Sequence, residues 1–127
     1  MGVLNFDLVS RSVKYLNDDP FFKENVRFYN FILCLECEED RYYYNVSDGK
    51  ITVLDANDDL RADVVISGNQ ENWGKIIDGM QGGMHRAFRH KMLHFSGNPA
   101  IMLSVWKTIW RIGEALTKAN EEETHAV

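Results

Sequence analysis

The sequence predicts an α+β fold, in which helices pack on one face of a five-stranded, mostly antiparallel sheet. Three observations support this class. Residues 26–55 contain three runs of alternating apolar and polar side chains, separated by turns. Residues 62–112 follow the order strand, helix, short helix, strand and long helix, with turn residues at the junctions. The chain has 127 residues, which predicts a single domain over 1–127.

The N-terminal segment predicts a helix over about residues 4–17. Its apolar side chains lie near helical spacing, at Leu4, Leu8, Val9, Val13 and Leu16. Pro20 should end it, because proline disfavours helical backbone in the residue before it. We expect a linker from Phe21 to about Asn25, with room for one further turn.

Three strands should follow as a meander. Residues 26–38 predict a long strand that places Phe31, Leu33, Leu35 and Cys37 on one face by alternation. Residues 41–46 predict the second strand and residues 51–55 the third. Asp48-Gly49 between them is a hairpin turn signal, so these strands should pair antiparallel.

The second half of the chain carries clear start and stop signals. Residues 64–66 are β-branched and predict a buried strand, after which Asn69 can cap a helix. This helix should end in a glycine-rich segment at 79–83. Leu93 and Phe95 alternate as on a half-buried strand. Asn98-Pro99 then predicts the start of one closing helix over about 99–119, followed by a frayed tail at 120–127.

This order of elements resembles a known family. The residues that carry the likeness are Ala62-Asp63, the helix that ends near Gly79, Ala87-Phe88, and Leu93-x-Phe95-x-Gly97-Asn98 before the closing helix. The pattern is similar to the sterol carrier protein type of lipid-binding domain over roughly residues 25–115. Members of that family bind sterols, fatty acids, acyl thioesters or related lipids, so the resemblance implies a lipid ligand here.

One position departs from the family. Lys91 stands at the turn into the Leu93 strand, where the family usually has glycine. A non-glycine residue with positive φ costs on the order of 1 kcal/mol, so we expect this turn to be reshaped.

Aromatic and methionine residues recur through the helical segments and indicate an apolar ligand site. Flexible methionine side chains suit a surface that accepts variable apolar shapes. We predict that the protein binds a lipid or other long apolar molecule in a tunnel between sheet and helices, and that its function extends to transfer of this ligand. For any one residue a place in the core is the simpler interpretation. The predicted ligand-binding residues are Phe31, Leu33, Leu35, Trp73, Ile77, Met80, Met84, Phe88, Phe95, Met102, Leu103, Trp106, Ile109 and Trp110.

An alternative function stays open. The same fold could serve as an accessory or dimerisation module, including a homodimer, that presents an apolar intermediate to an enzyme. An exposed patch of Trp106, Trp110 and Ile112 would favour this, because large apolar surface patches usually mark partners.

A basic cluster spans residues 85–94 in a chain of net charge −5. Arg86, Arg89 and Lys91 form a candidate patch for an anionic head group, through transient membrane contact, or for a partner. Its histidines would form a metal site only if the helix continued through 91–93, which the predicted strand denies. We therefore expect no metal ligands.

Other function classes find no support in the sequence. Cys34 and Cys37 form a CxxC within a predicted strand, where residues three apart face opposite ways, so a structural role is expected. The common nucleophile and phosphate-loop motifs are missing, so we predict no enzyme activity and no cofactor. The pI near 5.3 argues against nucleic acid as a partner. Residues 1–10 do not resemble a signal peptide and no window is apolar enough to span a bilayer, so we expect a cytoplasmic protein.

Overall fold

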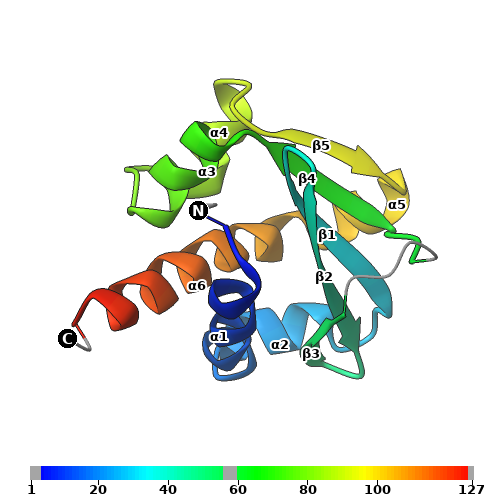
Figure 1. Cartoon of the computed structure of the whole chain (residues 1–127). Helices are drawn as coiled ribbons and strands as arrows, with labels where there is room; N and C mark the ends of the chain where they lie inside the picture. The colour runs from blue at the N-terminus through cyan, green and yellow to red at the C-terminus, as the bar shows by residue number, and fades with distance from the viewer. Residues whose placement is uncertain (1–3, 56–59, 126–127) are drawn as a thin grey trace.

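A computed structural model describes residues 4–55 and 60–125; for residues 123–125 it describes the backbone only. It confirms the α+β class with a five-stranded sheet (Figure 1). The elements in chain order are α1 (Phe6–Asn17), α2 (Pro20–Val26), β1 (Phe31–Cys37), β2 (Asp40–Ser47), β3 (Lys50–Leu54), β4 (Val64–Gly68), α3 (Gln70–Ile77), α4 (Gly83–Arg89), β5 (His94–Gly97), α5 (Pro99–Ser104) and α6 (Trp106–His125).

The sheet has the strand order β3-β2-β1-β4-β5. Antiparallel pairing joins β1 to β2, β2 to β3 and β4 to β5, whereas β1 and β4 run parallel. Asp48 and Gly49 have φ values of 53° and 77°, which is the backbone that a tight hairpin turn with positive φ at both central residues requires. The expected antiparallel meander of the first three strands is therefore confirmed.

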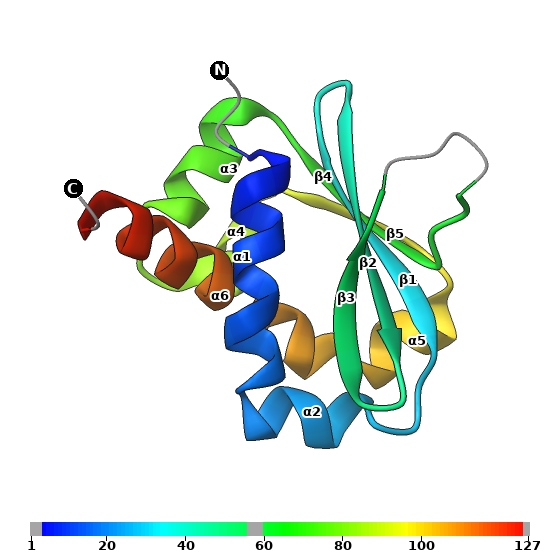
Figure 2. The same ribbon diagram turned by 60° about the horizontal axis from the view of Figure 1, so that its bottom comes forward.

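The core lies between the sheet and the helices that cover one of its faces. Figure 2 shows α1, α2, α3, α4 and α6 on the same side of the sheet, with α5 near its end. Leu33, Leu35 and Ile66 of the central strands are buried against this layer, as are Trp73 of α3 and Ile109 of α6. The Tyr44 and Ser12 hydroxyls, both buried, share a hydrogen bond of 2.7 Å, so these two polar groups of the interior are paired.

The expected linker after Pro20 is in fact helix α2, and β1 begins at Phe31 instead of residue 26. Asp19 Oδ1 accepts hydrogen bonds from the backbone N–H groups of Phe21 and Phe22, and Pro20 occupies the first turn. The proline that ends α1 therefore also starts α2. Burial of Phe22 and Val26 explains why so short a helix is stable.

The prediction of a single closing helix is also wrong, because Val105 interrupts the helix between α5 and α6. The Val105 carbonyl accepts from the Thr108 hydroxyl at 2.6 Å and from the backbone N–H groups of Thr108 and Ile109. Side-chain hydroxyls that compete for helical carbonyls tighten or bend a helix. The break separates α5, near the end of the sheet, from α6 on its covered face (Figure 2).

The predicted frayed tail is helical as far as His125, and residues 126–127 lie outside the described part of the chain. Two contacts hold this end of α6 on α1. Arg11 donates to the Ala119 carbonyl, and the Tyr15 hydroxyl donates to the Glu122 carboxylate. The segment is therefore helical up to His125, and its fraying stays a prediction.

The turn at Lys91 keeps the conformation that glycine would adopt, so the expected reshaping does not occur. Lys91 has φ 58°. Its N–H donates to the Phe88 carbonyl and the Met92 N–H donates to the Ala87 carbonyl, which is the bond pair of a Schellman motif. These bonds satisfy carbonyls at the end of α4 and offset the backbone strain.

Candidate ligand pocket

A pocket of about 520 Å³ lies between the α3–α4 corner and α6, within the range usual for small-molecule sites. We call it the α3–α6 pocket. It is lined by Ile76, Gly79, Met80, Gly82, Gly83, Met84, Trp110, Gly113, Glu114, Thr117, Lys118 and Glu121.

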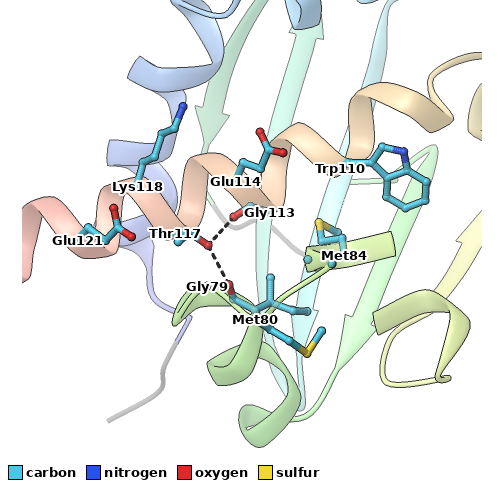
Figure 3. A pocket seen from close by; sticks show the side chains of 12 residues that line it. Gly79, Met80, Met84, Trp110, Gly113, Glu114, Thr117, Lys118 and Glu121 are labelled. Carbon is cyan, nitrogen blue, oxygen red and sulfur yellow. Dashed lines mark hydrogen bonds between the residues drawn. The ribbon is translucent and has the colours of Figure 1, made fainter. Parts of the chain in front are cut away.

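The corner between α3 and α4 depends on left-handed backbone. Gly79 and Gly82 have φ values of 90° and 85°, which side-chain-bearing residues rarely adopt. The chain therefore ends α3, reverses and starts α4 within a few residues. This places Met80 of the corner and Met84 of α4 on the same pocket wall (Figure 3).

Two contacts fix the corner against α6. The Thr117 hydroxyl donates to the Ile76 carbonyl at 2.8 Å and also lies 3.0 Å from the Gly113 carbonyl. A Cβ at Gly113 would lie 2.6 Å from Met84 Cγ, so only glycine lets the buried Met84 side chain approach α6 this closely. The Met84 wall is therefore packed, whereas Met80 is only half-buried.

The lining changes character along α6. Figure 3 shows Trp110 at one end beside Met84, Thr117 in the middle, and Lys118 and Glu121 at the other end. The Glu114 carboxylate pairs with Arg111 at 3.3 Å, whereas Lys118 is exposed and has no ion pair among the described side chains. The pocket is thus apolar at its Trp110 end and polar at its Lys118 end.

An aromatic cluster continues from the apolar end. Ring centroids are 4.9 Å apart for Trp110 and Trp106, 4.9 Å for Trp106 and Phe88, and 5.2 Å for Phe88 and Phe95. His85 adds an edge contact to Trp110 at 4.8 Å. All of these pairs have the edge-to-face geometry that favours aromatic contact. Phe88 remains 42% exposed, so the cluster reaches the surface.

A model of the SCP-2 sterol transfer family matches residues 13–109 of the chain. The chain belongs to this family. No individual curated protein is similar enough in sequence to count as a relative. The resemblance predicted from the residues is thereby confirmed, and with it lipid binding or transfer as the general function of the family.

Solved structures agree on the fold. Sterol carrier protein 2 has a TM-score of 0.71 at 12% identity, covering 91% of this chain and 97% of that one. A conserved hypothetical protein from Thermus thermophilus, suggested to be a sterol carrier protein, has a TM-score of 0.68 at 12% identity, covering 94% and 90%. The UbiJ-SCP2 ubiquinone synthesis protein has a TM-score of 0.57 at 16% identity, covering 86% and 95%.

The structure distributes the predicted ligand-binding residues of this SCP-2 family member over several places. Met80, Met84 and Trp110 line the α3–α6 pocket, and Phe88, Phe95 and Trp106 form the aromatic cluster. Met102 and the 78% exposed Leu103 lie on α5. The others are buried in the core, namely Phe31, Leu33, Leu35, Trp73, Ile77 and Ile109. Contact of a ligand with any of these residues stays a prediction.

The α6 part of the pocket lining was missed, although a sequence signal for it exists. Gly113, Glu114, Thr117, Lys118 and Glu121 follow Trp110 at offsets of 3, 4, 7, 8 and 11, which is one helical stripe. Because this stripe contains both polar and apolar residues, apolar periodicity alone did not indicate it. Ile112, whose exposure together with Trp106 and Trp110 would have favoured the accessory module, is buried.

A second hollow, of about 600 Å³, lies between α2 and the β2–β3 turn. Its lining is mainly polar and charged, namely Asn17, Asp18, Pro20, Lys23, Glu24, Arg27, Asp48, Gly49 and Lys50. The α3–α6 pocket, with methionine and tryptophan walls, suits an apolar ligand better.

The cysteines of the CxxC face opposite sides of β1, as expected. Cys37 belongs to the core, and Cys34 borders a small hollow of about 120 Å³ on the other face of the sheet. Burial raises the pKa of the Cys34 thiol from 9.0 to about 11 and also raises the pKa of Cys37. Both thiols are therefore protonated at neutral pH, which fits the structural role that we predicted.

Within residues 4–55 and 60–125 no three His, Cys, Asp or Glu side chains are grouped closely enough to hold a metal ion. No helix of this described part has the length and apolar character needed to cross a bilayer.

Proposed function

We propose that the α3–α6 pocket binds the chain of a long apolar molecule, such as a fatty acid or an isoprenoid, and that the protein carries this ligand. The pocket walls formed by Met80, Met84 and Trp110 are the observation that supports it. Methionine thioethers adapt to apolar shapes, and each ligand methylene removed from water contributes about 0.8 kcal/mol. This proposal moves the site from the predicted tunnel between sheet and helices to the pocket between the α3–α4 corner and α6.

The polar end of the pocket suggests how a ligand would be oriented. Lys118 is exposed there and has no ion pair among the described side chains, while the neighbouring Glu114 is paired with Arg111. A ligand carboxylate could therefore pair with Lys118 while its chain extends toward Trp110. We propose binding and carriage without any bond being made or broken, and the cytoplasm as the place of action stays a prediction.

A fatty acid binding assay on two variants tests this proposal. It compares two half-buried methionines, both of which the sequence predicted to contact the ligand. Met80 lines the pocket, whereas Met102 lies on α5 outside it. Met80→Lys places a charge in the apolar wall and should weaken binding of a fluorescent fatty acid by about tenfold or more. Met102→Lys is the matched control and should leave the dissociation constant within about twofold. Equal losses in the two variants, or no saturable binding by the wild type, would contradict the proposal.

A second candidate is the accessory module that presents an apolar intermediate to a partner. Phe88 and Leu103 are exposed by 42% and 78%, which favours contact with another molecule. Native mass spectrometry of protein purified from its own source separates the two functions. A retained lipid supports the carrier, and an empty homodimer supports the module.

A further inference from the structure

The acidic residues of this chain are unevenly distributed. All 19 Asp and Glu residues lie outside residues 79–113, although five of the 14 Lys and Arg residues lie within that segment. It contains α4, β5, α5 and the start of α6. A protein of net charge −5 therefore has a 35-residue segment, with five cations and no acidic residue, that would attract an anionic surface.

Four of these five cations are available at the surface. Arg111 is compensated by Asp19 and Glu114, at 3.5 and 3.3 Å. The other four have exposed side chains and no ion pair within the described residues: Arg86 and Arg89 on α4, Lys91 in the turn after it, and Lys107 in the first turn of α6.

The aromatic cluster comes from the same segments as these cations. In the sequence of α4, Phe88 lies between Arg86 and Arg89, and its ring contacts that of Trp106, the residue before Lys107. We call the four cations together with Phe88, Phe95, Trp106 and Trp110 the aromatic–basic face. Half-exposed aromatic rings beside Lys and Arg are typical of protein segments that lie in the interface of a bilayer.

This face adjoins the proposed ligand site. Trp110 belongs both to the pocket lining and to the aromatic cluster, and Met84 of the pocket lies on α4. An apolar ligand is dissolved in a bilayer before it is carried, so a docked protein would hold its pocket near the source. The exposed ring of Phe88 and the neighbouring apolar pocket favour a bilayer over an acidic protein as the occupant, and the second measurement below distinguishes the two.

We propose that the aromatic–basic face docks on bilayers that contain anionic phospholipids. The surface potential attracts the four cations, and Phe88 enters the interface. Delivery of ligand from that position depends on the proposed function of the pocket, whereas docking itself does not.

Vesicle flotation tests the electrostatic part. Wild type should float with vesicles of phosphatidylcholine and phosphatidylserine and remain unbound with phosphatidylcholine alone. The double variant R86Q/R89Q should partition about 30-fold more weakly onto the anionic vesicles. The matched control K23Q/K50Q removes two exposed cations at α2 and β3, at the opposite end of the molecule from α4 (Figure 1), and should partition like wild type. Equal weakening of both variants, or equal binding to both vesicle types, would overturn the proposal.

A second measurement separates a membrane from an acidic protein as the occupant. Vesicles with brominated acyl chains should quench the fluorescence of Trp106 and Trp110, and Phe88→Ser should weaken partitioning about fivefold. Binding to anionic vesicles without any quenching would indicate a purely ionic contact and overturn docking through this face.

A third measurement keeps the failure of docking distinct from the failure of the pocket. In the absence of vesicles, R86Q/R89Q should bind the fluorescent fatty acid as wild type does. If the wild type binds the fatty acid but does not bind anionic vesicles, the docking surface alone is refuted. Vesicle binding without any fatty acid binding would refute the pocket and leave docking standing.

Discussion

Replacing Gly113 by alanine tests the packing that forms the inner wall of the pocket. The new Cβ would lie 2.6 Å from Met84 Cγ and 2.9 Å from its Sδ, both too close for carbon or sulfur. Alanine is favoured over glycine within a helix by about 1 kcal/mol, whereas overpacking costs about 1–3 kcal/mol. We therefore expect Gly113→Ala to lower the free energy of unfolding by about 0–2 kcal/mol.

The same substitution should have the opposite sign once Met84 is shortened. Met84→Ala removes both Cγ and Sδ and by itself should cost about 2–5 kcal/mol, because Met84 is buried. In that background Gly113→Ala meets no obstacle and should stabilise the protein by about 1 kcal/mol. The expected coupling between the two positions is therefore about 1–3 kcal/mol.

Urea unfolding followed by tryptophan fluorescence, to which the buried Trp73 contributes, measures all four proteins of this double-mutant cycle. Gly113→Ala should also weaken binding of the fluorescent fatty acid, because a displaced Met84 occupies pocket volume. An equal change in unfolding free energy with and without Met84 would refute the close packing of Met84 on α6.

Two further predictions concern single residues. Lys91→Gly should stabilise the protein by up to about 1 kcal/mol, because φ at this position is 58°, whereas the control Lys75→Gly within α3 should destabilise it by about 1 kcal/mol; thermal unfolding compares them. The raised pKa of Cys34 stabilises the fold fully below pH 9, and this contribution should be lost as pH rises through about 11. The urea midpoint should thus fall over that window, less steeply in Cys34→Ala; an identical pH profile in this variant would contradict the role of the thiol.

Local signals in the sequence predicted much of the fold. Asp48-Gly49, Asn69 and Asn98-Pro99 each specify their own turn or cap through bonds within a few residues, and the structure has all of them where expected. Alternation along β1 likewise placed Leu33 and Leu35 on the buried face. Such features depend on backbone geometry and neighbouring side chains, which a sequence displays directly.

The predictions of the fold that were wrong concern residues that serve two elements, or residues whose backbone cost is offset by hydrogen bonds that the prediction did not consider. Pro20 follows the end of α1 and also begins α2. Because proline was interpreted only as the end of a helix, the start of the second helix was not predicted. The Lys91 turn was judged from the cost of its φ angle alone, although the carbonyls of Ala87 and Phe88 offset that cost. A sequence also does not display contacts between distant segments, such as those of Arg11 and Tyr15 of α1 with the end of α6.

The sequence by itself determined the family and the order of most elements. It also predicted an apolar ligand, because the number and spacing of aromatic and methionine residues can be read directly from a sequence. The tertiary structure decided where those residues meet. Met80 and Met84 reach Trp110 only because the α3–α4 corner packs on α6 at Gly113, and the polar end at Lys118 comes from the same helix stripe. A pocket is space that side chains from separate segments fail to fill, and this depends on how the helices cross, which no local pattern records.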